Sequence, residues 1–147
     1  MLNARLTEEL AQLVNIPPQQ AAVGSVVSGW VSVKNALTMM ALINTGAFGA
    51  SATVDANIQQ ATSAAGANAK AITGKAITQL VAASGANKQV LINLRPQELD
   101  TNNGFSFVQL TVTVGVAATY VAADLMAHLR YETDDAFNQA AVIQILA

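Results

Sequence analysis

Apolar residues in most of this chain recur at every second position, in short runs that end at glycine, asparagine, serine or proline. In one clear run, Val54, Ala56 and Ile58 alternate with polar neighbours. A period of two places successive side chains on opposite faces of a strand, whereas an amphipathic helix repeats every three or four residues. After Pro17 and Pro18 no long segment has the helical period, so the pattern predicts a chain built mainly of β-strands.

The number and length of these runs indicate the fold class. Turn residues divide the chain into seven or eight short strands, which is typical of an antiparallel β-sandwich or barrel. The run from Ala36 to Ile43 is apolar on both faces, as in a strand that is covered on both sides. We expect a mainly β fold with a short N-terminal helix and an apolar C-terminal tail. The expected parts are an N-terminal arm at residues 1–25, a β-sandwich core at 26–131 and a tail at 132–147.

A short internal repeat suggests an irregular strand. Lys-Ala-Ile-Thr occurs twice, and its two isoleucines, Ile72 and Ile77, would face opposite sides of a regular strand. Gly74 lies between them, where a bend or bulge would bring both isoleucines inward.

The first segment has a helical pattern. Leu6, Leu10, Leu13 and Val14 follow i, i+4, i+7 and i+8 spacing, and the pair Pro17–Pro18 ends the pattern. A helix of two turns is marginal alone in water, so this stripe must pack on its own domain or on a neighbour.

The last residues form the second terminal segment that must pack. An acidic stretch at 132–135 is followed by five large apolar side chains, which an isolated tail would expose to water. We therefore predict that both terminal segments carry contacts between subunits. The predicted interface residues are Leu6, Leu10, Leu13, Val14, Phe137, Val142, Ile143, Ile145 and Leu146.

The charge content supports an assembled protein. Only 11% of the residues are charged, against about 25% in an ordinary soluble domain. Because the cores of interfaces are depleted in charge, this composition favours a surface that is covered in an assembly. The alternative is a small-residue β-protein whose amides and hydroxyls keep it soluble. A net charge of −2 with scattered basic residues argues against nucleic-acid binding, and no apolar run approaches the ~20 residues of a membrane span.

The residues that usually carry chemistry give no catalytic, cofactor or metal site. The chain has no cysteine and one histidine, His128, with no identifiable nucleophile paired to it. Residues 69–76 fail as a phosphate loop because alanine occupies both ends. Residues 100–104 fail as a calcium loop because Thr111 stands where the bidentate glutamate belongs. We therefore expect a protein that is not an enzyme and needs no cofactor.

Several stretches resemble a group of small proteins encoded among the structural genes of tailed bacteriophages. They are Ala52–Thr62, Ala69–Leu80, Asn87–Asp100 and Gly104–Gly115, and the likeness covers roughly residues 30–130. The resemblance implies an auxiliary head protein of the decoration or cement type, which binds the outer capsid lattice and cross-links major capsid subunits. It also implies no catalytic residues.

Within that setting we expect a homo-oligomer, a trimer, bound to the major capsid protein on the capsid exterior and assembled in the cytoplasm of a bacterial host. No nucleic acid or membrane partner is expected. One alternative is a tail or head-tail connector component. The other is a carbohydrate- or receptor-binding module on the virion surface, although the single tryptophan, Trp30, adjoins apolar residues and is expected in the core rather than on a binding platform.

Overall fold

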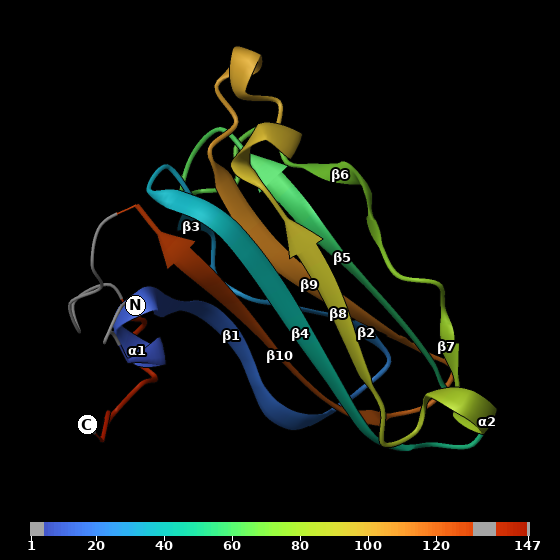
Figure 1. The fold of residues 1–147 in the computed structure, drawn as a ribbon. Coiled ribbons are helices and arrows are strands. Elements are labelled where there is room, and N and C mark those ends of the chain that lie inside the picture. The colour runs from blue at the N-terminus through green and yellow to red at the C-terminus, as the bar shows by residue number, and fades with distance from the viewer. Residues whose placement is uncertain (1–4, 131–137, 147) are drawn as a thin grey trace.

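The computed structural model describes residues 5–130 and 138–146, and it shows two antiparallel sheets packed face to face (Figure 1). Sheet A has the strand order β1-β10-β4-β8, and sheet B has the order β2-β9-β5-β6, with β3 also on β9 and β7 also on β5. The predicted mainly β, antiparallel sandwich is confirmed. The strands are β1 Leu10–Ala21, β2 Gly24–Val27, β3 Val31–Ser32, β4 Ala36–Phe48, β5 Thr53–Ala61, β6 Lys70–Ala76, β7 Leu80–Val81, β8 Gln89–Leu94, β9 Phe107–Gly115 and β10 Thr119–Leu129. The short helices are α1 Leu6–Glu9, α2 Ala82–Gly85, and the 3₁₀ turns η1 Pro96–Glu98 and η2 Thr101–Asn103.

The strands of the described part occupy eight rows, four in each sheet. β2 and β3 both pair with β9, at Thr111–Val114 and at Phe107–Val108, so they lie end to end along one edge. Between them, Ser28 continues the row, because its backbone N–H donates to Leu110 O at 3.0 Å. β6 and β7 share β5 in the same way. The row count therefore agrees with the seven or eight strands that were expected, although β1 was expected to be helical and β4 extends beyond the expected run Ala36–Ile43.

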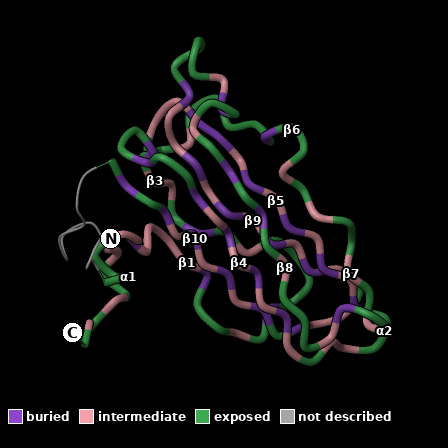
Figure 2. Tube along the Cα trace, viewed as in Figure 1, coloured by how far each residue is buried: buried purple, intermediate pink, exposed green. Residues whose placement is uncertain are grey.

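The core lies between the sheets and follows from the period of two. Along β10 each second residue from Thr119 to Leu129 is buried, and along β9 each second residue from Val108 to Val114 is buried (Figure 2). The core side chains are mainly alanine, valine, isoleucine and leucine. Burying such residues contributes about 25 cal/mol per Å² of apolar surface, so the alternating pattern itself sets which face of each strand turns inward.

A short N-terminal helix is present as predicted, but its expected extension to Val14 is wrong. Only Leu6–Glu9 is helical, and the chain continues as β1, which pairs with β10 from Leu10 to Ala21. Tertiary pairing overrides the local helical spacing here, because a 12-residue edge strand gains a full row of hydrogen bonds. Residues 10–21 thus belong to the sandwich, and the boundary expected at residue 25 falls inside β2.

The two prolines do not end the segment either. Pro17 and Pro18 lie in a register shift between Ile16 and Gln19, on a strand that forms the edge of sheet A. Proline has no backbone N–H to donate to a neighbouring strand. It is tolerated here because a bulge on an edge strand requires no donor at that position.

The bulge expected at Gly74 is present. The β5–β6 register shifts between Asn57 and Gln59, and Gly74 has φ +75°, a left-handed conformation that favours glycine. As predicted, both isoleucines turn inward: Ile72 is buried, and Ile77 packs against the core.

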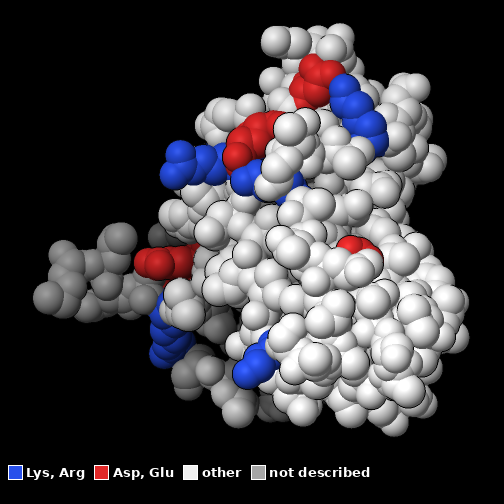
Figure 3. Space-filling view, turned by 90° about the vertical axis from the view of Figure 1, so that its right-hand side faces the viewer, with Lys and Arg blue, Asp and Glu red and all other residues white. Residues whose placement is uncertain are grey.

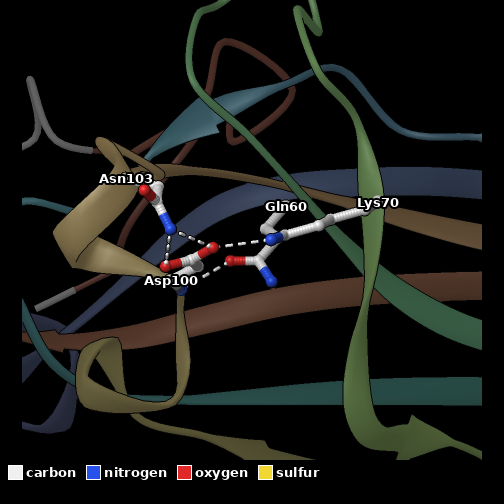
Figure 4. A network of polar contacts seen from close by, with 4 residues as sticks. All are labelled: Gln60, Lys70, Asp100 and Asn103. Atoms are coloured by element: carbon white, nitrogen blue, oxygen red, sulfur yellow. Dashed lines mark hydrogen bonds and ion pairs between the residues drawn. The ribbon is translucent and has the colours of Figure 1, made fainter.

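Charged side chains gather at the end of the sandwich where η1 and η2 lie. Lys70 Nζ donates to Asp100 Oδ2 at 2.6 Å, and Asn103 Nδ2 donates to both oxygens of the same carboxylate (Figure 4). Asp100 N–H in turn donates to Oε1 of the buried Gln60 at 2.8 Å. The hydrogen bond from Lys70, followed by that from Asn103, lowers the pKa of Asp100. Together with the bond to Gln60, these contacts tie the loop after η1 to sheet B.

The free edge of β8 is blocked by a side chain. Lys75, on β6, donates to the backbone oxygen of Asn93 at 2.6 Å and forms an ion pair with Glu98 at 2.8 Å. The hydrogen bond from Lys75 is the main reason that the pKa of Glu98 is lowered. A lysine on a sheet edge discourages another strand from pairing there.

Replacing Lys75 with methionine should expose the β8 edge to pairing between molecules. We expect Lys75→Met to increase self-association and thioflavin binding on concentration, because Asn93 O would lose its donor and the edge would lose its charge. Light scattering over time measures this. Lys88→Met makes the same chemical change on an exposed lysine and should have little effect. Equal behaviour of the two variants would contradict the edge-blocking role.

Candidate assembly surfaces

The two described ends of the chain meet beside β1 (Figure 1). A groove of about 370 Å³ is lined by Leu6 and Leu10 from the N-terminal side and by Val142, Ile145 and Leu146 from the C-terminal side. The sequence placed these five residues in one interface from two distant segments, and the structure brings them together. We call this hollow the terminal groove.

The C-terminal segment is held against the edge of β1 by backbone contacts. Gln12 N–H donates to Asn138 Oδ1 at 2.8 Å, and the Gln139 N–H donates to Gln12 O at 2.8 Å. Both groups of Gln12 that point away from β10 are therefore satisfied, as they would be by a further strand. The segment covers this part of the sheet edge within its own chain.

The other predicted interface residues are placed differently. Leu13 and Val14 are partly buried and pack against the core, so they support the sandwich itself. Ile143 is 94% exposed and Leu146 is 83% exposed. Phe137 lies outside the described residues. The C-terminal segment thus turns Val142 and Ile145 into the groove and leaves Ile143 and most of Leu146 available for another molecule.

A second candidate surface was missed by the sequence reasoning: the outer face of sheet A. The run Ala36–Ile43 was expected to be covered on both sides, and β4 does alternate buried residues with partly buried ones. No second layer of the described chain covers the outer side, because sheet B packs on the inner side alone. The outward side chains of β10, β4 and β8 are Tyr120, Ala122, Asp124, Met126, His128, Thr38, Met40, Leu42, Asn44, Gln89, Leu91 and Asn93.

This face is apolar at its centre and hollowed toward both ends. Met126 lies opposite Met40, and Asp124 lies opposite Leu42, which itself pairs with Leu91. A hollow of about 370 Å³ at one end includes Met40, Met126 and His128, and one of about 580 Å³ at the other end includes Asn44 and Tyr120. Methionine adapts its shape to a partner, so such a face suits a protein contact.

Asp124 is the one acid among those outward residues. Gln12 Nε2 donates to its Oδ1 at 2.5 Å, yet burial among apolar neighbours is the larger effect and raises the pKa of this carboxyl. Ion pairs within the described residues join Arg5 to Glu8, Lys70 to Asp100 and Lys75 to Glu98, and none includes Asp124.

The outer face of sheet B has the opposite character. Its outward positions carry hydroxyls and amides, for example Thr113, Thr111 and Gln109 on β9 beside Asn57 and Gln59 on β5. Where such side chains are exposed they remain hydrated at low cost, but Asn57 Oδ1 and Thr111 Oγ1 are shielded from solvent and form no hydrogen bond within the described residues.

A third candidate surface lies at the end of the sandwich opposite to η1 and η2. Gly49 N–H donates to Ala118 O, and Ala82 N–H donates to Ala52 O, which joins neighbouring loops. Register pairs on either side place Val23 next to the β9–β10 loop. None of the residues in these segments is charged, although the exposed Lys88 directly follows them, and the lower right of Figure 3 shows no Lys, Arg, Asp or Glu. We call this surface the uncharged end; it comprises residues 22–23, 47–52, 80–87 and 115–118.

Val116 is the most unusual residue of the uncharged end. It has φ +68° and is 68% exposed. A β-branched residue in the left-handed region is strained, typically by about 1–3 kcal/mol. The other non-glycine residues with positive φ in residues 5–130 and 138–146 are Ser51, Asn68 and Asn87. An exposed, strained valine gives the fold no packing benefit, so it points to a contact outside the chain.

The structure offers little for chemistry or for sugar binding. Across residues 5–130 and 138–146, no group of three or more histidine, cysteine or acidic residues is placed to hold a metal. None of the helices in this part is long and apolar enough to cross a bilayer. Trp30 is half-buried, and a Cβ on Gly66 would lie 2.5 Å from its Nε1, so the loop of residues 62–69 covers the indole.

Comparisons with known proteins give no family. No family model and no curated protein match the sequence. Among solved structures, a chain of the disulfide-linked pili of Bacillus endospore appendages has TM-score 0.39 at 12% identity, covering 88% of this chain and 98% of that one. Cowpea mosaic virus top component, a naturally occurring empty particle, has TM-score 0.45 at 7% identity, with 91% and 94% covered. The empty virus-like particle of the same virus has TM-score 0.37 at 8% identity, with 90% and 89% covered. Likenesses at these values carry no argument about this chain.

The C-terminal segment allows a matched test of the predicted contact between subunits. Ile143→Asp should leave the fold and its melting temperature unchanged, because the side chain is almost fully exposed, but it should reduce the oligomer by placing a charge in the contact. Ile145→Asp should instead loosen the segment from the terminal groove. Size-exclusion chromatography with light scattering measures the oligomer, and circular dichroism measures the fold. An oligomer unchanged by Ile143→Asp would show that the segment packs within its own chain alone.

Proposed function

We propose that this chain is a virion structural protein, a decoration or cement subunit that stands on the outside of a bacteriophage capsid and cross-links major capsid subunits. The observation that carries the proposal is the separation of charge along the sandwich: one end has Lys88 alone at its border, and the other holds the ion pairs of Lys70 with Asp100 and of Lys75 with Glu98. A subunit with this polarity places the uncharged end on the particle and the charged end in solvent. The sequence resemblance to small structural proteins of tailed phages supports the same role.

The uncharged end is suited to a lattice surface. Its exposed side chains are mainly alanines and valines such as Val23, Val81 and Val116, with Ser51, Ser84 and Asn87 among them. The apolar side chains have little entropy to lose on binding. Each fully buried valine contributes at least about 1.5 kcal/mol, and many copies on one lattice add their contributions. Small individual contacts repeated in this way resist the pressure of packaged DNA.

The terminal groove and the C-terminal segment are assigned to contacts between copies. Because they lie beside β1, on the flank of the sandwich, neighbouring subunits reach them while the uncharged end stays on the capsid. A trimer at the three-fold position where capsomers meet fits lattice symmetry. The apolar groove and the exposed Ile143 would be paired in this trimer.

Copy number separates this role from the tail or connector role. Quantitative mass spectrometry of purified particles should find the chain in hundreds of copies per particle, at a fixed ratio to the major capsid protein. About three to twelve copies, matching the symmetry of a portal or tail, would replace the proposal with a connector or tail part. Absence of the chain from the particle would contradict any structural role in the virion.

Substitutions at the uncharged end should separate binding from folding. Val116→Asn introduces a residue that adopts the left-handed region more readily than valine does, so the melting temperature should stay equal or rise. Binding to capsids produced without the chain should weaken by about tenfold, because a buried valine becomes polar. Sedimentation of the protein with capsids measures this.

The control for Val116→Asn is the same change at Val27, which is exposed on sheet B outside the uncharged end. Val27→Asn should leave capsid binding unchanged. Equal binding by the Val116 variant and the wild type would place the capsid contact elsewhere.

A further inference from the structure

The outer face of sheet A carries a carboxylate whose cationic partner is not supplied by the described chain. Asp124 lies in the middle of the face, between Ala122 and Met126 along β10 and opposite Leu42 on β4. Its Oδ1 accepts from Gln12, and it takes part in none of the ion pairs of the described residues. An acid that is desolvated among apolar side chains is stabilised by a cation or a strong donor brought from outside.

The same strand holds a matching donor on the same face. His128 is exposed and lies two positions beyond Met126, as Asp124 lies two positions before it. The two side chains are therefore roughly 13 Å apart along the strand, too far to pair within one chain. They are placed symmetrically about Met126, which is the arrangement that a two-fold contact needs.

We propose that the outer face of sheet A packs against the same face of a second copy. The two copies are related by a two-fold axis that lies between the two faces and passes over Met126 of β10. In this contact Asp124 of each copy faces His128 of the other, and the Met126 side chains meet at the axis. The occupant of the face is thus another molecule of this chain, and charge complementarity is what selects it.

The charges also select the direction of the two-fold axis. An axis parallel to β10 would place Asp124 opposite Asp124 of the second copy, and two desolvated carboxylates repel each other. An axis that runs across the strand, between the two faces, sets the two β10 strands antiparallel and exchanges the positions of residues 124 and 128. Packed sheets lie about 10 Å apart, a gap that an aspartate and a histidine pointing toward each other can bridge.

The rest of the face is consistent with this contact. Met40, which pairs with Met126, would lie opposite Met40 of the second copy, and Leu42, which pairs with Asp124, would lie opposite Thr38 of the second copy. Polar positions lie toward the border, where Gln89 Nε2 already donates to Asn44 Oδ1 at 2.7 Å. An apolar centre with a polar rim is the usual anatomy of a protein interface.

This contact rests on the homo-oligomer of the proposed function and adds to it a second surface between copies, separate from the terminal groove. On a capsid, a two-fold contact between flanks would link one trimer to the next, so that decoration subunits form a connected net. Self-association is measured without capsids, whereas the uncharged end is tested by capsid binding. The two proposals can therefore fail separately.

Charge exchange between two variants tests the contact. Asp124→His and His128→Asp should each weaken self-association by about tenfold, because each places like groups opposite each other. A one-to-one mixture of the two variants should restore association, since every facing pair then joins a carboxylate to an imidazole. Native mass spectrometry counts homodimers and mixed dimers, and Ile143→Asp is present in both chains to remove the contribution of the C-terminal segment.

Two control variants show whether the effect is specific to Asp124 and His128. Arg130→Gln changes the next basic residue along the chain and should leave dimerisation unchanged, and Asp55→His makes the aspartate change on sheet B with the same result expected. Circular dichroism confirms that each variant is folded. A mixture that associates no better than the single variants would overturn the proposal. If either single variant dimerises like the parent chain, the face belongs to a different partner and the proposal is also overturned.

Discussion

The double pairing of β10 determines the arrangement of the remaining strands of sheet A. This strand is hydrogen-bonded to β1 on one side and to β4 on the other, along nearly its whole length. Its inner residues supply a row of the core, and its outer residues include Asp124, Met126 and His128. Because β1 lies near the start of the chain and β10 near its end, the same pairing brings the terminal segments together and creates the terminal groove.

The period of two predicted the fold class because burial enforces it locally. Each strand with one face in the core must alternate, so the class and the row count could be read without the strand order. The bulge at Gly74 was predictable as well, since two isoleucines of opposite parity can both turn inward only if the strand between them is irregular. Strand order and pairing were not predictable, because they depend on contacts between residues far apart in the sequence.

The N-terminal segment shows where local reasoning fails. Leu6, Leu10, Leu13 and Val14 satisfy helical spacing, but the free edge of β10 offers this segment a full ladder of hydrogen bonds. A helix of two turns gains less than that. The two prolines that would end a helix fit an edge strand equally well, because the register shift near them removes the need for their N–H groups.

The candidate surfaces divide in the same way. Apolar residues at the two termini were recognisable because they would otherwise be exposed to water, and five of them line the terminal groove. The outer face of sheet A was not predicted as a surface. Ala36–Ile43 is apolar on both faces, as observed in the sequence, and was therefore expected to be covered on both sides. The sequence cannot show that the second cover is missing from the described chain. The uncharged end was also present in the sequence, as four segments without charge, but the fold alone shows that these segments adjoin.

The position of β10 also affects how the molecule is made. During synthesis β1 and β4 leave the ribosome long before the strand that joins them, so sheet A cannot close while the chain is still growing. Its strands wait with unpaired edges, a state in which nascent chains are prone to bind one another. Sheet A therefore closes only after residues 119–129 have been made, because until then β1 lacks its partner and one edge of β4 stays open.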